Sequence, residues 1–117
     1  MAGEGRIVKP RGSAIGARMS LIPADDCTDM SQVRAAIDAL DGEIVALLGR
    51  RMRYIEAAAR IKQARGDVRD EARKAEVIAN ARAAAIEAGF PDGLTAASFE
   101  MLVEGSIAHE YEAFDAR

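Results

Sequence analysis

The sequence contains no tryptophan, and only 4% of its 117 residues are aromatic. Half of the residues are nevertheless apolar, and alanine and charged residues are abundant among the remainder of the chain. No segment alternates apolar and polar residues in the manner of a half-buried strand. The composition therefore favours helices over a β-sheet, and the length is typical of one domain.

The chain also has only one cysteine and no excess of positive charge. Cys27 is a single thiol, which excludes an internal disulfide framework and is typical of a protein from a reducing compartment. No apolar run approaches the roughly 18 residues of a membrane span. The net charge is −3 and the sequence pI is about 5.2, which argues against general nucleic-acid binding. We therefore expect a cytoplasmic protein that binds neither nucleic acid nor membrane.

The first 22 residues differ in composition from the rest. Residues 1–20 hold four glycines, one proline and four basic residues against one glutamate. The segment lacks the apolar centre of a secretory signal. We expect residues 1–22 to form a disordered basic arm or tag, and residues 23–117 to form the folded domain.

Apolar residues at helical spacing predict three helices, over residues 31–65, 70–88 and 95–114. The expected N-caps are Ser31, Asp70 and Thr95, and the expected stops after the first two helices are Gly66 and Gly89. The first helix would be about 50 Å long, which is more than a compact domain of this size needs. A chain of three unequal helices closes poorly on itself, so we expect an all-α, intertwined homodimer.

Two cations interrupt or extend the apolar face of the first helix. The series that predicts this face is Val33, Ile37, Leu40, Ile44 and Leu47. Its next position is Arg51, and Lys62 follows 11 residues later on the same face, about 16 Å along the axis. Alone, Arg51 could snorkel or pair with a carboxylate, and Lys62 could simply favour the helix dipole.

Polar residues also interrupt the third helix, and more cations lie elsewhere. Ser106 and Glu110 are four residues apart on its apolar face, although alone they could be a packing residue and a solvent-facing acid. Arg34 precedes Arg51 by 17 residues, about 25 Å along the helix and roughly 100° around it, so it could share a ligand only with a partner's Arg51. Together with Arg69, Asp70 and Arg73 of the loop, these residues predict a pocket for an anion, most naturally a dicarboxylate.

The order and spacing of these residues resemble the all-helical chorismate mutases. The matching pattern is R-x2-ID-x2-D-x9-R-x10-K, from Arg34 to Lys62, followed by VRD-x2-R and S-x3-E. The resemblance covers about residues 23–115 and implies an entwined helical dimer with two pockets. The first helix, and the short connection from Lys62 to Asp70, look still more like the isochorismate-pyruvate lyase branch of the same fold.

The resemblance also implies a role for each matching residue. Arg34 of the partner chain and Arg51 would each bind one substrate carboxylate, and Lys62 would bridge a carboxylate and the ether oxygen. Asp70, with Arg73 nearby, would accept the ring hydroxyl. Ser106 would assist the hydroxyl or carboxylate region, and Glu110 would face the ether oxygen. Lys74 stands where many mutases have a glutamate, which weakens the case for a hydroxyl contact there.

The conversion of chorismate to prephenate is a pericyclic rearrangement, so the resemblance implies no metal, cofactor or nucleophile. Lys62, Glu110 and Arg51 would be the catalytic residues, and because Glu110 donates only when protonated, we expect the best activity at acidic pH. We expect a chorismate mutase, with isochorismate-pyruvate lyase as the alternative. The polar loop and Ser106 favour the mutase, whereas the first helix favours the lyase. A non-catalytic helical dimerisation module, with its stripe charges in interhelical pairs, is the alternative of another class.

Overall fold

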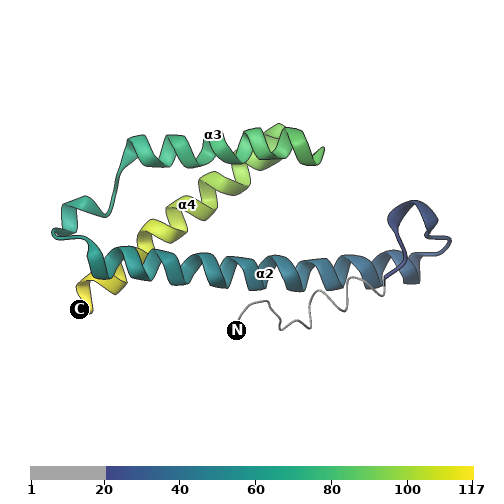
Figure 1. Cartoon of the computed structure of the whole chain (residues 1–117), viewed down its shortest axis with the longest axis horizontal. Helices are drawn as coiled ribbons and strands as arrows, with labels where there is room; N and C mark the ends of the chain where they lie inside the picture. The colour runs from purple at the N-terminus through teal and green to yellow at the C-terminus, as the bar shows by residue number, and fades with distance from the viewer. Residues whose placement is uncertain (1–20) are drawn as a thin grey trace. The chain divides into compact units, whose positions relative to one another are not determined.

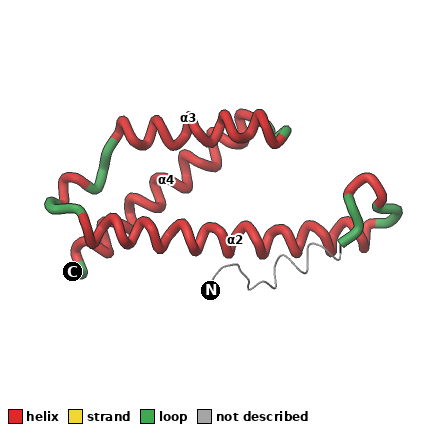
Figure 2. The backbone as a smooth tube through the Cα atoms, viewed as in Figure 1, coloured by secondary structure: helices red, strands yellow, loops and turns green. Residues whose placement is uncertain are grey.

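The computed structural model describes residues 21–117, so nearly all of the predicted N-terminal arm lies outside the described residues. All regular elements within residues 21–117 are helical (Figure 2). The elements are η1 (Ala24–Asp26), α2 (Met30–Ile61), η2 (Arg65–Asp67), α3 (Glu71–Ala88) and α4 (Asp92–Asp115). The predicted all-α class with three main helices, the first of them the longest, is confirmed.

The chain divides into two parts, one ending at Arg50 and the other spanning Arg51–Arg117, and α2 contributes to both. In the first part, η1 and the early turns of α2 line an apolar cavity of about 530 Å³, and Cys27 and Val33 are among the lining residues. Among the described residues, no helix has both the length and the apolar character needed to cross a membrane.

The second part is built on the packing of α3 against α4. Val68, Val103 and Ile107 are buried together, and the partly buried side chains of Val77, Tyr111 and Phe114 pack around them. A tight turn at Gly89 joins α3 to α4, and α4 runs back obliquely from the end of α3 towards the end of α2 (Figure 1). Gly89 has a φ of 69°, a conformation that glycine adopts without strain, and it ends α3 as predicted.

The ends of α2 differ from the prediction. Ser31 lies within the helix rather than at its N-cap, because Oδ1 of Asp29 accepts the hydrogen bond from the backbone N–H of Gln32 at 2.9 Å. The helix stops at Ile61, four residues before the predicted end. Gly66 is therefore not its C-terminal stop but part of η2, a turn in which Asp67 Oδ2 accepts from the backbone N–H of Ala64 at 3.1 Å.

The N-termini of the other two helices give one success and one error. Asp70 caps α3 as predicted, since Oδ1 accepts from the backbone N–H of Arg73 at 3.0 Å. Thr95 does not cap α4, which begins earlier, at Asp92, after Pro91 at the N-cap. The Thr95 hydroxyl instead donates to the carbonyl oxygen of Pro91 at 2.9 Å from inside the first turn. Proline supplies the backbone angle of a helix entrance without the N–H that the entrance leaves unpaired.

Candidate active site

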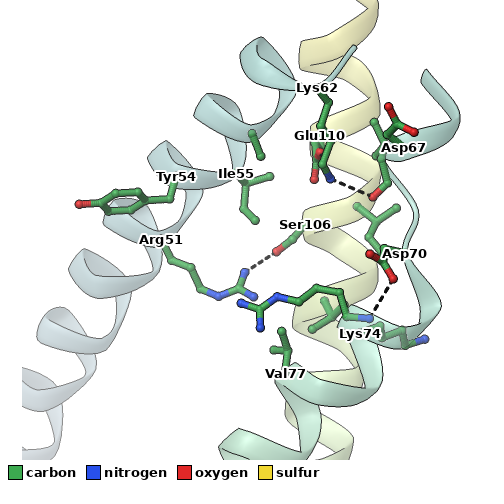
Figure 3. Close-up of a pocket in the computed structure, with 15 residues that line it drawn as sticks. Arg51, Tyr54, Ile55, Lys62, Asp67, Asp70, Lys74, Val77, Ser106 and Glu110 are labelled. Atoms are coloured by element: carbon green, nitrogen blue, oxygen red, sulfur yellow. Dashed lines mark hydrogen bonds and ion pairs between the residues drawn. The ribbon is translucent and has the colours of Figure 1, made fainter. Parts of the chain in front are cut away.

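A pocket in the second part gathers most of the residues singled out in the sequence (Figure 3). Its volume is about 490 Å³, which suits a small organic ligand. The predicted site residues that line it are Arg51, Lys62, Asp70, Arg73, Ser106 and Glu110. They come from the end of α2, the connection that follows, the start of α3 and the second half of α4, so the fold brings together positions up to 59 residues apart.

Arg51 is held by a hydroxyl rather than by an acid. Its Nη1 donates to Ser106 Oγ at 2.7 Å (Figure 3). The Ser106 hydroxyl in turn donates to the carbonyl oxygen of Leu102 at 2.8 Å. Ser106 is only 3% exposed. Because this neutral partner leaves the guanidinium charge uncompensated at this contact, Arg51 is suited to receive an anion.

Lys62 and Glu110 form the second pair of the pocket. Lys62 Nζ lies 2.7 Å from Glu110 Oε2, and it also donates to the carbonyl oxygen of Val68 at 3.4 Å. Glu110 is 5% exposed, which excludes the alternative that it drifts to the solvent face of α4. The structure thus brings the predicted ether-oxygen residues together, as a buried carboxylate against a partly exposed ammonium.

Asp70 and Arg73 line the pocket from the start of α3. Asp70 is exposed, and one of its carboxylate oxygens accepts the hydrogen bond from the backbone N–H of Arg73 that caps α3. Arg73 is also exposed, and its Nη1 donates to Glu76 Oε1 at 2.7 Å. Asp70 therefore combines a structural contact with a position at the pocket, whereas Arg73 already shares its charge with a neighbouring acid.

An ion-pair network missed by the sequence analysis fixes the loop and α3 to α4. Glu104 accepts from Arg69 at 2.7 and 3.1 Å and from Lys74 Nζ at 2.6 Å, and Lys74 also pairs with Glu100 at 2.7 Å. Hydrogen bonds from Arg69, and then from Lys74, lower the pKa of Glu104 to about 2. Lys74 lines the pocket, but an ammonium group only donates, so Lys74 cannot accept a hydrogen bond from a substrate hydroxyl as a glutamate would.

Aliphatic side chains form the remaining wall. Val68 and Val103 are nearly fully buried, and Ile107 and the half-buried Ile55 and Val77 complete the apolar surface. A wall of this kind lowers the local dielectric, which strengthens the interaction of Arg51 and Lys62 with an anion. The chemistry that the pocket allows is binding and electrostatic stabilisation of a small anion, with a carboxyl group within reach of the lysine.

Arg34 lies in the first part of the chain and is not among the residues that line this pocket. It is exposed on α2, 17 residues before Arg51 in the sequence. The predicted role of Arg34 in a pocket therefore stays a prediction that depends on a second chain.

Residues 33–111 match the family model of chorismate mutase type II. The chain belongs to the chorismate mutase type II family. Among curated proteins it is similar to the isochorismate pyruvate lyase of Pseudomonas aeruginosa, with 33% identity over 86 residues. That alignment covers 74% of this chain and 85% of the lyase. The predicted family is confirmed, and so is its likeness to the lyase branch, while the family name and the relative point to two different reactions.

Membership of the chorismate mutase type II family gives the pocket a context. The family match runs from α2 into the last turns of α4 and so contains all seven predicted site residues. The network of Arg69, Lys74 and Glu104 lies inside the same match, although no local pattern in the sequence signalled it.

Proposed function

We propose that the protein is a chorismate mutase, which converts chorismate to prephenate. The observation that carries this proposal is the placement of Arg51 and Lys62 opposite Ser106 and Glu110 in one apolar-walled pocket. Chorismate carries two carboxylates and an ether oxygen, and this pocket offers a complementary group to one carboxylate and to the ether oxygen. Arg51 matches one carboxylate through its planar fork, and Lys62 matches an oxygen that gains negative charge.

The rearrangement needs positioning and charge stabilisation rather than a nucleophile. The pocket would hold the dianion in its compact conformer, so that the carbon–carbon bond forms as the carbon–oxygen bond breaks. Lys62 Nζ would donate to the ether oxygen as negative charge grows there. A protonated Glu110 would add a second donor, and its loss of charge would release Lys62 from their ion pair.

A second copy of the chain would complete the site with Arg34. Ala59 is the only residue of α2 that is buried within this chain, whereas Ile37, Leu40, Ile44 and Leu47 are between 42% and 57% exposed. A helix with such an apolar face is unstable in water unless another surface covers it. We therefore propose a homodimer in which the face around Arg34 meets the partner, as the family resemblance implies. We also propose that the protein is cytoplasmic, since a single cysteine is typical of a reducing compartment.

A second candidate is isochorismate-pyruvate lyase activity, which would release salicylate and pyruvate. The specific observation in its favour is the 33% identity to the lyase of Pseudomonas aeruginosa. The same cations would bind isochorismate, since the two substrates carry the same acidic groups. The polar side chains of Asp70 and Ser106 at the pocket favour the mutase over the lyase.

The deciding experiment gives the purified chain chorismate and isochorismate in parallel at mildly acidic pH, with products separated by chromatography. Efficient formation of prephenate with little salicylate would support the mutase, and salicylate with pyruvate would support the lyase. If both substrates stay unchanged, the non-catalytic helical module is the better interpretation.

Matched variants at neighbouring positions assign the activity to this pocket. Arg51→Ala removes a proposed carboxylate ligand, and we expect kcat/KM to fall by about 100-fold or more, as when one preorganised donor is lost. Arg50→Ala removes the same kind of charge from an exposed residue that does not line the pocket, so we expect little change. Equal effects of the two substitutions would contradict the proposed site.

A further inference from the structure

Lys62 directly follows the last residue of α2, and its backbone is held by an arginine from beyond the end of α4. The last carbonyl groups of a helix have no partner within it. Arg117 Nη1 donates to the carbonyl oxygen of Lys62 at 2.6 Å and to that of Ala59 at 3.0 Å. Its guanidinium also stacks on the Phe114 ring, with the Cζ 3.8 Å from the ring centroid. A cation at this position additionally favours the helix dipole.

The chain on the other side of Lys62 is held by the same region of α4. Arg65, three residues further on, donates to both carboxylate oxygens of Asp115, at 2.9 and 3.2 Å. Its guanidinium lies over the ring of Tyr111, 4.4 Å from the centroid. Both contacts raise the pKa of the Arg65 guanidinium, through the hydrogen bond to Asp115 first, so the pair is charged throughout the physiological range.

The residues that make these contacts form one cluster between the last turns of α4 and the backbone on either side of Lys62. We name it the α4 clamp and define it as Arg65, Tyr111, Phe114, Asp115 and Arg117. None of its members lines the pocket. The last turn of α4 meets the end of α2 at this point (Figure 1), one turn beyond Glu110, which pairs with the Lys62 side chain.

We propose that the α4 clamp is a positioning device for Lys62, and this inference rests on the proposed function. Lysine is a flexible side chain whose rotamers interconvert readily unless something holds them. Before substrate arrives, Glu110 holds the ammonium group. Once the substrate competes for that ammonium, two contacts keep the Cα of Lys62 at a fixed distance from the pocket. Arg117 holds the Lys62 carbonyl group directly, and Arg65 ties the chain three residues further on to Asp115. A merely structural clamp would stabilise the helices without affecting the reaction.

The first test compares Arg117→Ala with Arg82→Ala. Arg82 donates to both oxygens of Asp92 at 2.8 and 2.9 Å near the Gly89 turn, so it is an exposed arginine that joins two helices at a place away from Lys62. We expect kcat/KM to fall by about 10-fold or more in Arg117→Ala, because small displacements of a catalytic group are costly. We expect Arg82→Ala to change it by less than about 2-fold, at a similar change in the urea midpoint. Parallel activity effects in the two variants would overturn the proposal.

A double-mutant cycle then tests whether Arg117 acts through Lys62. If it does, Arg117→Ala has no further effect on kcat/KM once Lys62→Ala is present, and additive losses would contradict the proposal. The dissociation constant of the substrate gives the same cycle without turnover. Arg117→Lys keeps a donor for the carbonyl groups, and we expect it to recover most of the activity.

Two further controls keep the outcomes separate. If Arg117→Ala fails to fold, judged by circular dichroism, Arg65→Gln tests the clamp from its other side with a milder change. If the unchanged chain converts neither chorismate nor isochorismate, the proposed function fails. If the unchanged chain is active and the clamp variants match the Arg82→Ala control, only the positioning role fails.

Discussion

The side chain at position 110 decides whether the pocket has a hydrogen-bond donor besides its cations. The Glu110 carboxylate lies 2.7 Å from Lys62 Nζ, and an ionised carboxylate only accepts hydrogen bonds. Glutamine is nearly isosteric and presents an amide donor. Position 110 on α4 is therefore the place where one substitution turns an acceptor into a donor with little change in the shape of the pocket.

We expect Glu110→Gln to raise kcat/KM at pH 8 by about 10-fold, because the amide can donate to the ether oxygen and no longer holds Lys62 in an ion pair. Steady-state kinetics at this pH measure the effect. Glu112→Gln removes an exposed carboxyl group of the same helix and is the control. An equal or lower kcat/KM than in the unchanged chain would contradict a donor role for the side chain at this position.

Ser106 uses its hydroxyl twice, as the acceptor for Arg51 and as the donor to Leu102. We expect Ser106→Ala to lower kcat/KM by about 10-fold, because Arg51 loses its orientation, while the free energy of unfolding changes by about 1 kcal/mol. Thr95→Val is the matched control, since Thr95 is also buried in α4 and donates to the carbonyl group four residues earlier. An equal loss of activity in both variants would mean that the hydroxyl serves helix packing alone.

Among the helical elements, α3 and α4 are joined at the pocket edge by the network of Glu104. The pKa of Glu104 is about 2, below its ordinary value of 4.5, so the ionised carboxylate stabilises the folded state. This contribution is fully present above about pH 5 and disappears as the pH falls towards 2. The elements should therefore separate more readily in acid.

We expect Glu104→Gln to lower the free energy of unfolding at pH 7, and the difference from the unchanged chain to vanish as the pH approaches 2. Urea unfolding at several pH values between 7 and 2 measures it. Glu87→Gln, an exposed change on α3, provides the comparison. A difference that stays constant down to pH 2 would show that packing, and not the ion pairs, is affected.

The sequence was sufficient for elements whose signals are local. Helical periodicity predicted all three main helices, and Asp70 and Gly89 marked the ends of α3 correctly because a cap and a left-handed residue depend on a few neighbours. The error at Thr95 has a local cause as well, since Pro91 offered an earlier start. The end of α2 was overestimated because no glycine or proline lies between Gly49 and Gly66, while the chain leaves the helix after Ile61.

The site was predictable for the same reason, and only in part. Arg51, Ser106 and Glu110 stood out because each breaks an apolar face, and the structure turns them towards one pocket. Arg65 with Asp115 and Arg69 with Glu104 are 50 and 35 residues apart in sequence, and they carry no periodic signal. Ion pairs between exposed charges that are far apart in the sequence depend on the fold, so they cannot be predicted from the sequence alone.

At the scale of the whole molecule, the exposed apolar face of α2 and the distant Arg34 lead to one proposed assembly. Two chains would share residues, each pocket receiving Arg51 from one chain and Arg34 from the other. Such shared sites have a property that separate sites lack, because two inactive variants can restore one another in a mixed dimer.

We expect Arg34→Glu and Arg51→Glu each to be inactive as homodimers. When the two are co-refolded in equal amounts, half of the dimers are mixed and each has one intact pocket, so we expect about a quarter of the original activity. Activity assays before and after mixing measure this. No recovery, with mixed dimers verified by differential tagging, would indicate that Arg34 does not cross between chains.

The buried carboxylate of Glu110 also bears on which anions the pocket would accept. It supplies Lys62 with a counter-ion from the chain itself, so an anion from solution must compete with a carboxylate that is already desolvated. Chloride, phosphate or a simple monocarboxylate would gain little from that exchange. A ligand that engages Arg51 at the same time would gain a second ion pair in the same binding event, so we expect the pocket to favour anions with two acidic groups over common cellular anions.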